Sequence, residues 1–366
     1  MSASIIISID SLQTHTKTFF YLLSVYPTIP NYEIIIVDDS EHHDIDCDFF
    51  NVYPTLNYKL ITTTHKMGYG KANNLGAKNA SNDILVFMND DIILDNNCLE
   101  IITTDIISGI ADAVQPKLVY PQTGKIQSTG HTFTEYSNAH IFENASENTV
   151  VASISGKRSA LTTALCATKK VLFEKMGGFN EAYFNAWEGM EYCLKLSANG
   201  YTCYYDSNAK AYHIRGGARG MYKLNESSQS AYFWSKWKGL ISEDLHVYYN
   251  LQLNDSVKNR DYFVLNFSNV TDAIAILKKC GFQTMTQINY MHYSGLSCID
   301  FLKLVPFRLC QYNHPLIYFC DNQKQVVNNV LWFKYRRESS DIIMDLSGNV
   351  LFTYQILVSS IIPASS

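Results

Sequence analysis

The sequence has few charged residues and no basic block. Charged residues make up 17% of the 366 positions, and the formal net charge is -5. The nearest approach to a basic run is Lys334-Tyr335-Arg336-Arg337, which is typical of a solvated helix face. Because binding to a phosphate backbone needs clustered Lys and Arg, we expect no nucleic-acid partner.

The cysteines contain no close pair. Nine of them stand singly, at positions 47, 98, 166, 193, 203, 280, 298, 310 and 320. Zinc and redox motifs need closely spaced pairs, so this spacing excludes both kinds of site. An odd, scattered set is typical of free thiols in a reducing compartment, and it predicts a cytoplasmic protein.

The sequence also lacks a leader and a membrane-spanning run. Residues 1–10 carry no positive leader and too short an apolar run for a signal peptide, and they predict a first strand instead. The most apolar carboxyl-terminal piece, residues 350–363, is interrupted by polar side chains, which makes it poor material for a membrane span. Peripheral contact with a membrane face is left open, as is a homodimer.

Two apolar runs in the first hundred residues end in acidic residues. Residues 84–88 are followed by Asn89, Asp90 and Asp91, and residues 34–37 by Asp38 and Asp39. Such runs are typical of strands buried on both faces of a parallel sheet. Ligands of an open α/β sheet bind beyond the carboxyl ends of its strands. The acids are therefore predicted to lie at a ligand site, although a polar turn is the simpler reading of either run alone.

Predicted strands and helices alternate through the same region. Strands are predicted at residues 4–9, 33–37, 58–63 and 84–88, with helices at 17–26 and after the glycines at 68 and 70. These glycines would let the backbone approach a ligand closely. The alternation predicts an α/β fold with a mostly parallel sheet and helices on its faces.

The Asn89-Asp90-Asp91 segment predicts a metal site with one carboxylate. Consecutive strand residues point to opposite faces, so Asn89 and Asp91 share a side and Asp90 faces away. Two carboxylates about 4 Å apart would repel by about 4 kcal/mol at an effective dielectric of about 20, which favours neutral Asn89 beside Asp91. A divalent cation such as Mg²⁺ or Mn²⁺ accepts such oxygen ligands and keeps positions open for phosphate. We expect weak binding until a diphosphate joins.

Six segments in a fixed order resemble family 2 glycosyltransferases, with rhamnosyltransferase-like features, over about residues 1–240. They are Ser4-Ile-Ile-Ile-Ser, Ile36-Val-Asp-Asp-Ser, Gly68-Tyr-Gly-Lys-Ala-Asn-Asn-Leu-Gly, Val86-Phe-Met-Asn-Asp-Asp, the pair Gln115-Pro-Lys-Leu-Val-Tyr-Pro and Gly124-Lys-Ile-Gln-Ser-Thr-Gly, and the acceptor-side block 173–201 with His213 after it. The resemblance implies a GT-A fold over residues 1–255, which is α/β with a Rossmann-like, mostly parallel sheet. It also implies a divalent metal (Mn or Mg), a nucleoside-diphosphate sugar donor and inverting transfer to a glycan or lipid-linked acceptor. The Gly68 segment favours a dTDP-sugar over a UDP-sugar.

The resemblance also implies roles for individual residues. Asp38 or Asp39 would hold the nucleotide, and Asp91 would coordinate the metal on the donor diphosphate. Asn89 would take the first position of the family's Asp-x-Asp motif, which is a mild departure. His213 would be a further metal or diphosphate ligand, although a lone histidine after a strand is more often structural. The remaining candidates for binding the nucleotide sugar are Asp10, Lys71, Asn74, Asp90 and Arg215.

The acceptor-side block departs from the family at one position. Family members commonly carry Glu-Asp there, whereas this chain reads Glu188-Gly189-Met190-Glu191. Inverting transfer needs a carboxylate that takes a proton from the acceptor hydroxyl. Glu188 is the predicted base and Glu191 the alternative, since the two would share one helix face. Acids that merely stabilise a helix amino terminus, and weakened or lost catalysis, stay open.

Two segments follow this block. Residues 213–221 resemble the mobile loop that closes over the donor in many such enzymes, and Arg215 and Arg219 would reach diphosphate oxygens. An ordinary surface loop is the alternative. Residues 230–240 are amphipathic and aromatic, which predicts a helix at the edge of the first domain or at its junction with a second.

The length favours two domains, and the resemblance ends near residue 256. Residues 256–366 are predicted to form a small α/β accessory domain. Its strands are expected at 261–267, 284–290, 316–320 and 342–346, and its helices at 270–280, 297–310 and 325–337. Acceptor binding, dimerisation, docking of a partner enzyme and simple stabilisation all stay open for it. For the whole chain, a non-catalytic nucleotide-sugar or glycan-binding module on the same fold is the alternative to a glycosyltransferase, suggested by Gly189 and Asn89.

Overall fold

The protein was analysed as a computed structural model. The structure describes residues 3–43, 45–46, 48–133, 138–143, 146–148, 150–214, 223–242, 244, 258–266, 268, 270, 272–289, 315–319, 341–348 and 350–353. The chain forms two compact units. The first comprises Met1–His131, Ser146–Asn148 and Ala152–Trp237, and the second comprises Thr132–Ala145, Thr149–Val151 and Lys238–Ser366.

The first unit is built on a sheet whose amino-terminal half is parallel. β1 (Ser4–Ile9), β2 (Glu33–Asp38), β3 (Tyr58–Thr62) and β4 (Ile84–Met88) lie in the order β3-β2-β1-β4. All their pairings are parallel, and β4 is buried throughout. The four strands expected in this region are confirmed. The apolar residues of β1, β2 and β4 are buried, as expected for strands covered on both faces, whereas β3 is only partly buried.

The other half of this sheet is mixed. β11 (Leu165–Lys169) is antiparallel to β4 and to β6 (Ala113–Tyr120), and β12 (Cys203–His213) runs parallel to β6. β5 (Ile92–Leu94), β7 (Lys125–Ser128) and β10 (Gly156–Lys157) are short antiparallel additions. Among the described residues the sheet has ten strands. The pairing of β12 with β5 returns the chain to the carboxyl end of β4.

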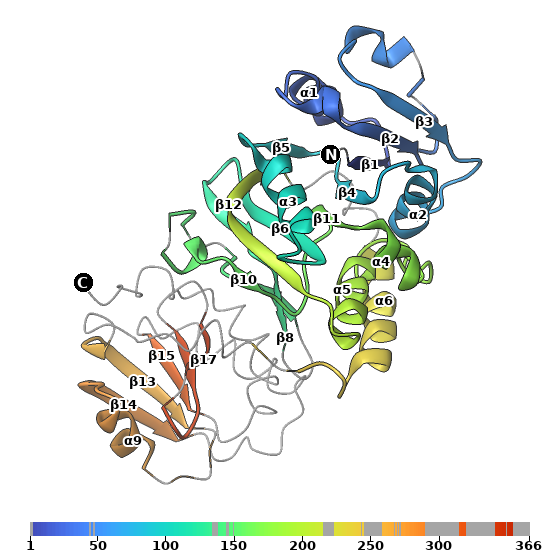
Figure 1. Cartoon of the computed structure of the whole chain (residues 1–366). Helices are drawn as coiled ribbons and strands as arrows, with labels where there is room; N and C mark the ends of the chain where they lie inside the picture. Colours follow the sequence, from blue (N-terminus) through green and yellow to red (C-terminus); the bar gives the residue numbers. More distant parts are fainter. Residues whose placement is uncertain are drawn as a thin grey trace. The chain divides into compact units, whose positions relative to one another are not determined.

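Helices cover both faces of the sheet (Figure 1). They are α1 (Thr14–Ser24), α2 (Tyr69–Asn79), α3 (Cys98–Ile107), α4 (Lys170–Lys175), α5 (Glu188–Ala198) and α6 (Lys223–Trp237), with 3-10 turns at Ile29–Asn31, Asp48–Val52 and Val150–Ser153. α1 begins earlier than expected because the Gln13 N–H donates to Thr16 Oγ1 (3.1 Å) and fixes its first turn. α1 buries Phe19, Phe20 and Leu23 in the core.

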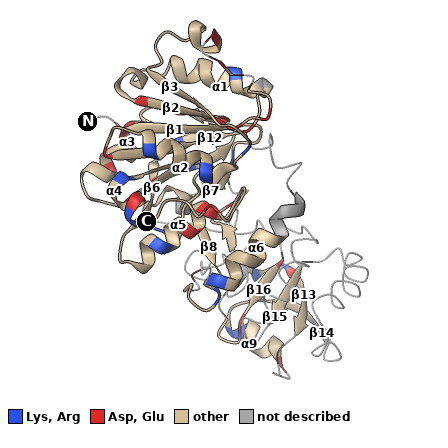
Figure 2. Ribbon diagram, turned by 90° about the vertical axis from the view of Figure 1, so that its right-hand side faces the viewer, with Lys and Arg blue, Asp and Glu red and all other residues tan. Residues whose placement is uncertain are grey.

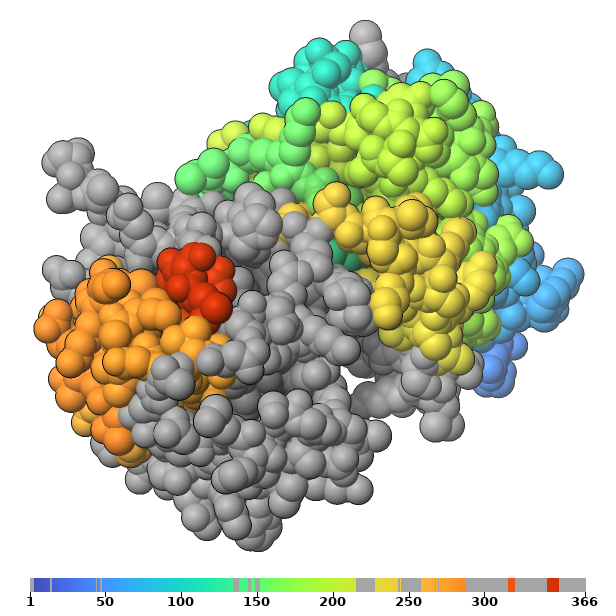
Figure 3. Space-filling model, turned by 90° about the horizontal axis from the view of Figure 1, so that it is seen from below, coloured from blue at the N-terminus to red at the C-terminus, as the bar shows by residue number. Residues whose placement is uncertain are grey.

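α6 belongs to the first unit. Lys236 Nζ donates to Glu191 Oε1 of α5 (2.6 Å), and Phe233 is fully buried with its ring 4.7 Å from that of Trp187. Figure 3 shows the surface of α6 beside the end of the first unit that carries α5. The last segment of the first unit therefore ends at Trp237, whereas the sequence placed the end of the first domain at residue 255.

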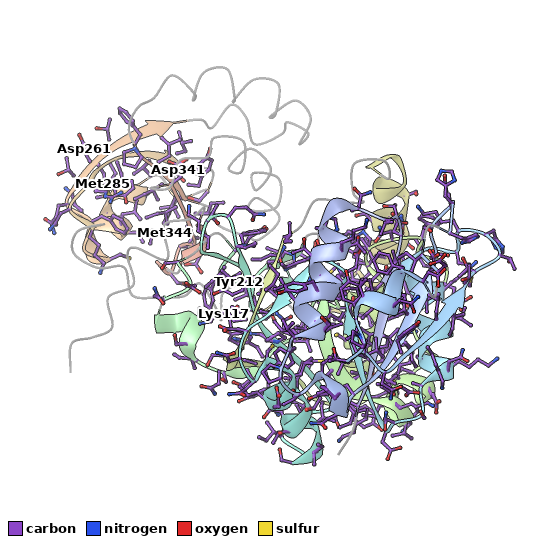
Figure 4. All side chains as sticks on the ribbon, turned by 90° about the horizontal axis from the view of Figure 1, so that it is seen from above. Lys117, Tyr212, Asp261, Met285, Asp341 and Met344 are labelled. Atoms are coloured by element: carbon purple, nitrogen blue, oxygen red, sulfur yellow. The ribbon has the colours of Figure 1, made fainter. Side chains whose placement is uncertain are left out.

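The second unit contains a separate, mostly parallel sheet. β13 (Asp261–Asn266), β14 (Thr284–Asn289), β15 (Leu316–Phe319), β16 (Ile342–Met344) and β17 (Val350–Thr353) lie in the order β14-β13-β15-β16-β17. α9 (Ala273–Lys279) follows β13. In Figure 4, Asp261 and Met285 mark β13 and β14, and Asp341 and Met344 mark β16. β8 (His131–Phe133) and β9 (Asn138–His140) form a separate pair.

The four strands expected in this unit are confirmed, and so is the first of its helices. The helices expected at 297–310 and 325–337 lie outside the described residues. β17 was not expected, because a four-residue apolar run does not by itself distinguish a strand from a helix segment. Within the described part of the chain, no helix has the length and hydropathy needed to cross a bilayer. Figure 2 shows Lys and Arg spread singly over the described ribbon.

Two buried carboxyl groups meet where α3 packs on β12. Asp105 is 6% exposed and Asp206 is 7% exposed. Asp206 Oδ1 accepts hydrogen bonds from the Asn208 N–H (2.8 Å) and the Ser155 hydroxyl (3.2 Å). Burial, together with a hydrogen bond to Asp206 and its charge, raises the pKa of Asp105 to about 7. The folded protein therefore holds a proton on this pair that the unfolded chain releases near pH 4.

Asp105→Asn is expected to stabilise the protein increasingly as pH rises. A folded pKa above the unfolded value means that the folded state binds more protons, so the wild type loses stability between about pH 4 and pH 7. The amide keeps a hydrogen-bond donor without ionising. The gain in unfolding free energy should grow by about 2 to 3 kcal/mol from pH 5 to pH 8, measured by urea denaturation. Exposed Glu41→Gln is the control, and equal gains at both pH values would contradict the shared proton.

Candidate functional site

The carboxyl ends of β1, β2 and β4 carry acidic residues to one edge of the sheet. Asp10 follows β1, Asp38 and Asp39 close β2, and Asn89 follows β4. The parallel register pairs Ile9 with Asp38, which aligns these strand ends. This edge is where an open α/β sheet binds its ligands.

Asp91 and His213 meet at this edge. β12 pairs with β5 so that His213 lies opposite Ile92, and the Ile214 N–H donates to the Asp91 carbonyl (3.1 Å). The Asp91 Oδ1 atom lies 2.9 Å from His213 Nε2. Asn89 Nδ2 lies 3.5 Å from the same nitrogen. The structure thus places Asn89 and Asp91 on one side, together with the histidine that follows them by more than a hundred residues.

Gln127 orients the imidazole ring of His213. Its Oε1 atom lies 2.6 Å from His213 Nδ1, and an amide oxygen can only accept. The hydrogen is therefore on Nδ1, and Nε2 faces Asp91. Gln127 lies in one of the segments that resemble the family, but the sequence assigned it no role, because only the pairing of β7 with β6 brings it beside β12.

These side chains fit a divalent metal ion. Asp91 supplies a carboxylate oxygen and His213 supplies Nε2, whose orientation is fixed through Nδ1 as in protein metal sites. Asn89 Oδ1 is buried and takes no hydrogen bond from any described residue, which leaves a carbonyl oxygen for a cation. Within the described residues, no group of three His, Cys, Asp or Glu side chains gathers. A site with this donor set needs ligand oxygens to complete it.

Gln127→Leu is expected to weaken metal binding without unfolding the protein. Loss of the Nδ1 partner frees the ring to rotate and to change tautomer, and such changes typically reduce metal affinity about 10-fold to 100-fold. The measurement is a Mn²⁺ titration followed by water proton relaxation or calorimetry. Gln283→Leu, at an exposed glutamine of the second unit, is the matched control. Equal affinity in Gln127→Leu and the wild type would remove Gln127 from the site.

Asp90 points away from this pair, toward α1. Its Oδ2 accepts a hydrogen bond from Thr16 Oγ1 (3.0 Å) and lies 4.0 Å from His15 Nε2. Burial first, and then the charge of Asp91, raises the pKa of Asp90 to about 7. A cation beside Asp91 would offset part of this repulsion.

Asp39 holds the turn that begins α2. Its carboxylate accepts the N–H groups of Met67 (2.7 Å) and Gly68 (2.8 Å) and the hydroxyl of Thr63 (3.0 Å). Burial raises its pKa, and these hydrogen bonds lower it only in part. Gly68 has φ +87°, and a Cβ there would lie 2.4 Å from the Phe184 carbonyl oxygen. Asp39 therefore shapes the glycine turn that the sequence placed near the donor.

Asp38 is fully buried beside it. Its Oδ1 accepts from the Ser40 N–H (3.0 Å) and hydroxyl (2.5 Å). Its Oδ2 is buried without a hydrogen bond from the described residues and lies 3.9 Å from His43 Nδ1. Of the two acids, Asp38 is the one that keeps an oxygen for a further donor.

The remaining nucleotide-sugar candidates have varied surroundings. Asp10 forms an ion pair with Lys66 (2.7 Å) at the edge of the sheet. Lys71 is half-buried on α2. The Asn74 amide accepts the Phe179 N–H (2.9 Å) and donates to the Phe179 carbonyl (2.9 Å), so it joins α2 to the acceptor-side block. Arg215 lies outside the described residues, as does most of the glycine-rich segment after it.

Glu191 is enclosed by hydrogen-bond donors. Lys236 Nζ (2.6 Å) and Asn180 Nδ2 (3.0 Å) donate to Oε1, and the Tyr183 hydroxyl (2.7 Å) donates to Oε2. Burial alone would raise the pKa of Glu191, but the hydrogen bonds from Lys236, Tyr183 and Asn180 outweigh it and lower the pKa. Both oxygens are occupied, so Glu191 ties α5 to α6 and to the segment before α5.

Glu188 opens α5 in a different environment. It is 3% exposed, and its Oε1 accepts the Ala186 N–H (3.2 Å). The two residues before it, Ala186 and Trp187, have φ values of 79° and 75°, a left-handed conformation that costs non-glycine residues energy. A Cβ at Gly70 would lie 3.8 Å from Glu188 Cγ. The strained turn thus directs Glu188 against the start of α2.

Tyr69 links the two sides of the site. Its hydroxyl donates to the Thr163 carbonyl (2.8 Å), and its backbone N–H donates to the Phe184 carbonyl (2.9 Å). Burial raises the pKa of Tyr69, and the charges of Glu188 and Asp91 raise it further. The phenol is therefore neutral. Gly70, the next residue, lies beside Glu188, and Thr163 precedes Ala164, whose carbonyl accepts the Asn89 N–H (2.9 Å). Tyr69 thus connects the surroundings of Glu188 with those of Asn89.

Comparison with known proteins supports this arrangement. The model for glycosyl transferase family 2 matches residues 5–166. The O-antigen biosynthesis protein RfbC of Myxococcus xanthus is 23% identical over 224 residues, which cover 59% of this chain and 17% of that protein. The uncharacterized protein y4gI of Sinorhizobium fredii is 25% identical over 206 residues, which cover 52% of this chain and 22% of that protein. The chain spans about a fifth of the length of these curated relatives.

A solved structure shares the fold. The crystal structure of GalNAc-T7 with UDP, GalNAc and Mn²⁺ is 17% identical, with a TM-score of 0.52, and the match covers 65% of this chain and 50% of that chain. At this identity the likeness shows the fold alone. The sheet order, the acidic edge and the family match agree with one another: the chain carries a glycosyltransferase domain with the GT-A fold, within which residues 5–166 match glycosyl transferase family 2.

Proposed function

We propose that the protein moves a sugar from a nucleoside-diphosphate donor to an acceptor hydroxyl, with inversion at the anomeric carbon. The observation that carries the proposal is the meeting of Asp91 and His213 at the sheet edge, together with buried Glu188 against Gly70 at the start of α2. The relative that acts in O-antigen biosynthesis supports a glycan or lipid-linked acceptor. The match to a structure that holds UDP supports a nucleotide-sugar donor, of which UDP-sugars and dTDP-sugars are the candidates.

Each side of the site has a distinct task. Glu188 takes the proton of the acceptor hydroxyl as the oxygen bonds to the anomeric carbon and the bond to the diphosphate breaks. Asp38 and the glycine turn held by Asp39 face the nucleotide. Asp91, His213 and Asn89 would hold a metal ion, Mn²⁺ or Mg²⁺, which would supply charge neutralisation for the departing diphosphate. The mixed oxygen and nitrogen donors favour Mn²⁺.

The chemistry around Glu191 supports Glu188 as the base. A general base needs affinity for the proton, and the hydrogen bonds from Lys236, Tyr183 and Asn180 stabilise the carboxylate form of Glu191 and lower its pKa. The five cysteines that the structure describes in full are free, which supports a reducing, cytoplasmic setting.

A donor panel tests the proposal. UDP-, dTDP- and GDP-sugars are incubated with the protein with and without Mn²⁺, and release of nucleoside diphosphate is measured. One donor is expected to give release that requires metal. The matching nucleoside diphosphate should raise the melting temperature, since saturation at about 100 times Kd adds about 2.7 kcal/mol of stability. The proposal would be refuted if no nucleotide sugar gave release and no nucleotide gave a thermal shift.

The alternative is a non-catalytic module that binds a nucleotide sugar or a glycan. Gly189 favours it, because this position lacks the acid that family members commonly carry. The two functions differ in turnover. A binding module would show a metal-dependent thermal shift with a nucleotide but no release of nucleoside diphosphate, even with excess donor.

A further inference from the structure

Gly189 lies in the first turn of α5, where glycine is unfavourable. Glycine costs about 1 kcal/mol relative to alanine within a helix. The structure gives a packing reason for its presence. A Cβ at Gly189 would lie 2.5 Å from both Cγ2 and Oγ1 of Thr163 and 3.0 Å from its Cβ. No side chain fits at position 189 while Thr163 keeps its place.

Thr163 cannot move aside easily. It is 9% exposed, and its branched side chain is stiff at χ1. Its carbonyl accepts the Tyr69 hydroxyl (2.8 Å). The next residue, Ala164, accepts the Asn89 N–H (2.9 Å). The backbone around Thr163 is therefore anchored to α2 on one side and to the metal-binding edge on the other.

The same contacts show where a side chain at position 189 would point. Its Cβ would face Thr163, which leads directly into the segment bonded to Asn89. An acid at 189 would thus begin against Thr163, one residue before the Ala164 carbonyl that accepts the Asn89 N–H. Glu188, one position earlier and about 100° around the helix, lies against Gly70 instead. Adjacent positions at the start of α5 offer two different approaches to one site.

We propose that Thr163 determines which of these positions carries the acceptor-side carboxylate. By filling the space beside Gly189 it excludes an acid there, and it leaves Glu188 to accept the proton. The two positions exclude each other sterically: a side chain the size of threonine at position 163 requires glycine at position 189. This rests on the proposed function, which assigns the base to Glu188. Steric exclusion by Thr163 also explains the glycine at position 189 without a loss of catalysis.

The exclusion is tested first by stability. Gly189→Asp alone is expected to lower the melting temperature by several degrees, and Thr163→Gly with Gly189→Asp should regain most of that loss. Thr162→Gly with Gly189→Asp is the matched control, because it removes a neighbouring threonine and opens no space beside Gly189. If Gly189→Asp alone melts like the wild type, Thr163 excludes nothing and the proposal fails.

The catalytic part is tested in a Glu188→Gln background. Hydrolysis of UDP-N-acetylglucosamine and dTDP-rhamnose, and their transfer where it occurs, is followed by nucleoside diphosphate release. Adding Thr163→Gly and Gly189→Asp together should raise the rate at least tenfold, with a pH profile that rises through an ionisation absent from Glu188→Gln. Adding Thr163→Gly alone should not.

The outcomes separate this inference from the proposed function. If the triple variant folds and binds nucleoside diphosphate but releases no more than Glu188→Gln, Thr163 does not decide the position of the carboxylate. If the wild type releases no nucleoside diphosphate from any donor, the proposed function fails. The melting temperatures of Gly189→Asp with and without Thr163→Gly still decide whether Thr163 and Gly189 exclude each other.

Discussion

Glu188→Gln is expected to slow transfer by roughly a thousandfold, within the range for loss of a general base. The amide keeps the size of the side chain and can still meet the Ala186 N–H through its oxygen. Binding of the donor should therefore be unchanged. The measurement is kcat for release of nucleoside diphosphate, together with the thermal shift that the nucleotide produces.

Glu191→Gln is the matched comparison, three residues along the same helix. It removes the charge that meets Lys236 and Lys195, so the expected loss is in stability, about 1 to 2 kcal/mol because Lys236 is partly exposed. Its kcat should fall less than about tenfold, since a contact that does not change in the transition state adds little to the rate. A larger fall in kcat for Glu191→Gln than for Glu188→Gln would reverse the assignment.

Asp91→Ala is expected to abolish the response to Mn²⁺. A bound metal supplies several kcal/mol to a departing diphosphate, and about 3 kcal/mol corresponds to roughly a hundredfold in rate. Release should fall by at least that factor, and Mn²⁺ should no longer increase the thermal shift given by a nucleoside diphosphate. Both effects follow from loss of the carboxylate that lies 2.9 Å from His213 Nε2.

The control for Asp91→Ala precedes the strand β4 that Asp91 follows. Asp83 is an exposed carboxylate at the amino end of β4, the opposite end from the site, so Asp83→Ala should keep both the rate and the metal response. If Asp91→Ala retained a metal-dependent rate, the ion would have to be held elsewhere. If the rate fell but the response to Mn²⁺ were intact, Asp91 would contact the substrate and not the metal ion.

Local sequence was sufficient for the strands and for the acidic edge. Residues 34–37 and 84–88 are continuous apolar runs, and burial on both faces of a parallel sheet is the arrangement that covers them. Strand alternation predicted that Asp90 faces away from Asn89 and Asp91, and the structure has Asp90 on Thr16 and Asp91 on His213. The physical cause differs, because residues 90 and 91 form a turn between β4 and β5. These features depend on neighbours one or two residues away, which the sequence contains directly.

Partners distant in the sequence needed the tertiary structure. Glu188 and Glu191 share a helix and cannot be told apart by spacing, but Lys236 reaches Glu191 from 45 residues away. Gln127 orients His213 across 86 residues, and Asp39 holds a turn 28 residues ahead. Gly189 appeared as a missing acid until Thr163 was seen to occupy its space. Spacing along the chain carries no information on such contacts, because strand order and helix packing decide which side chains meet.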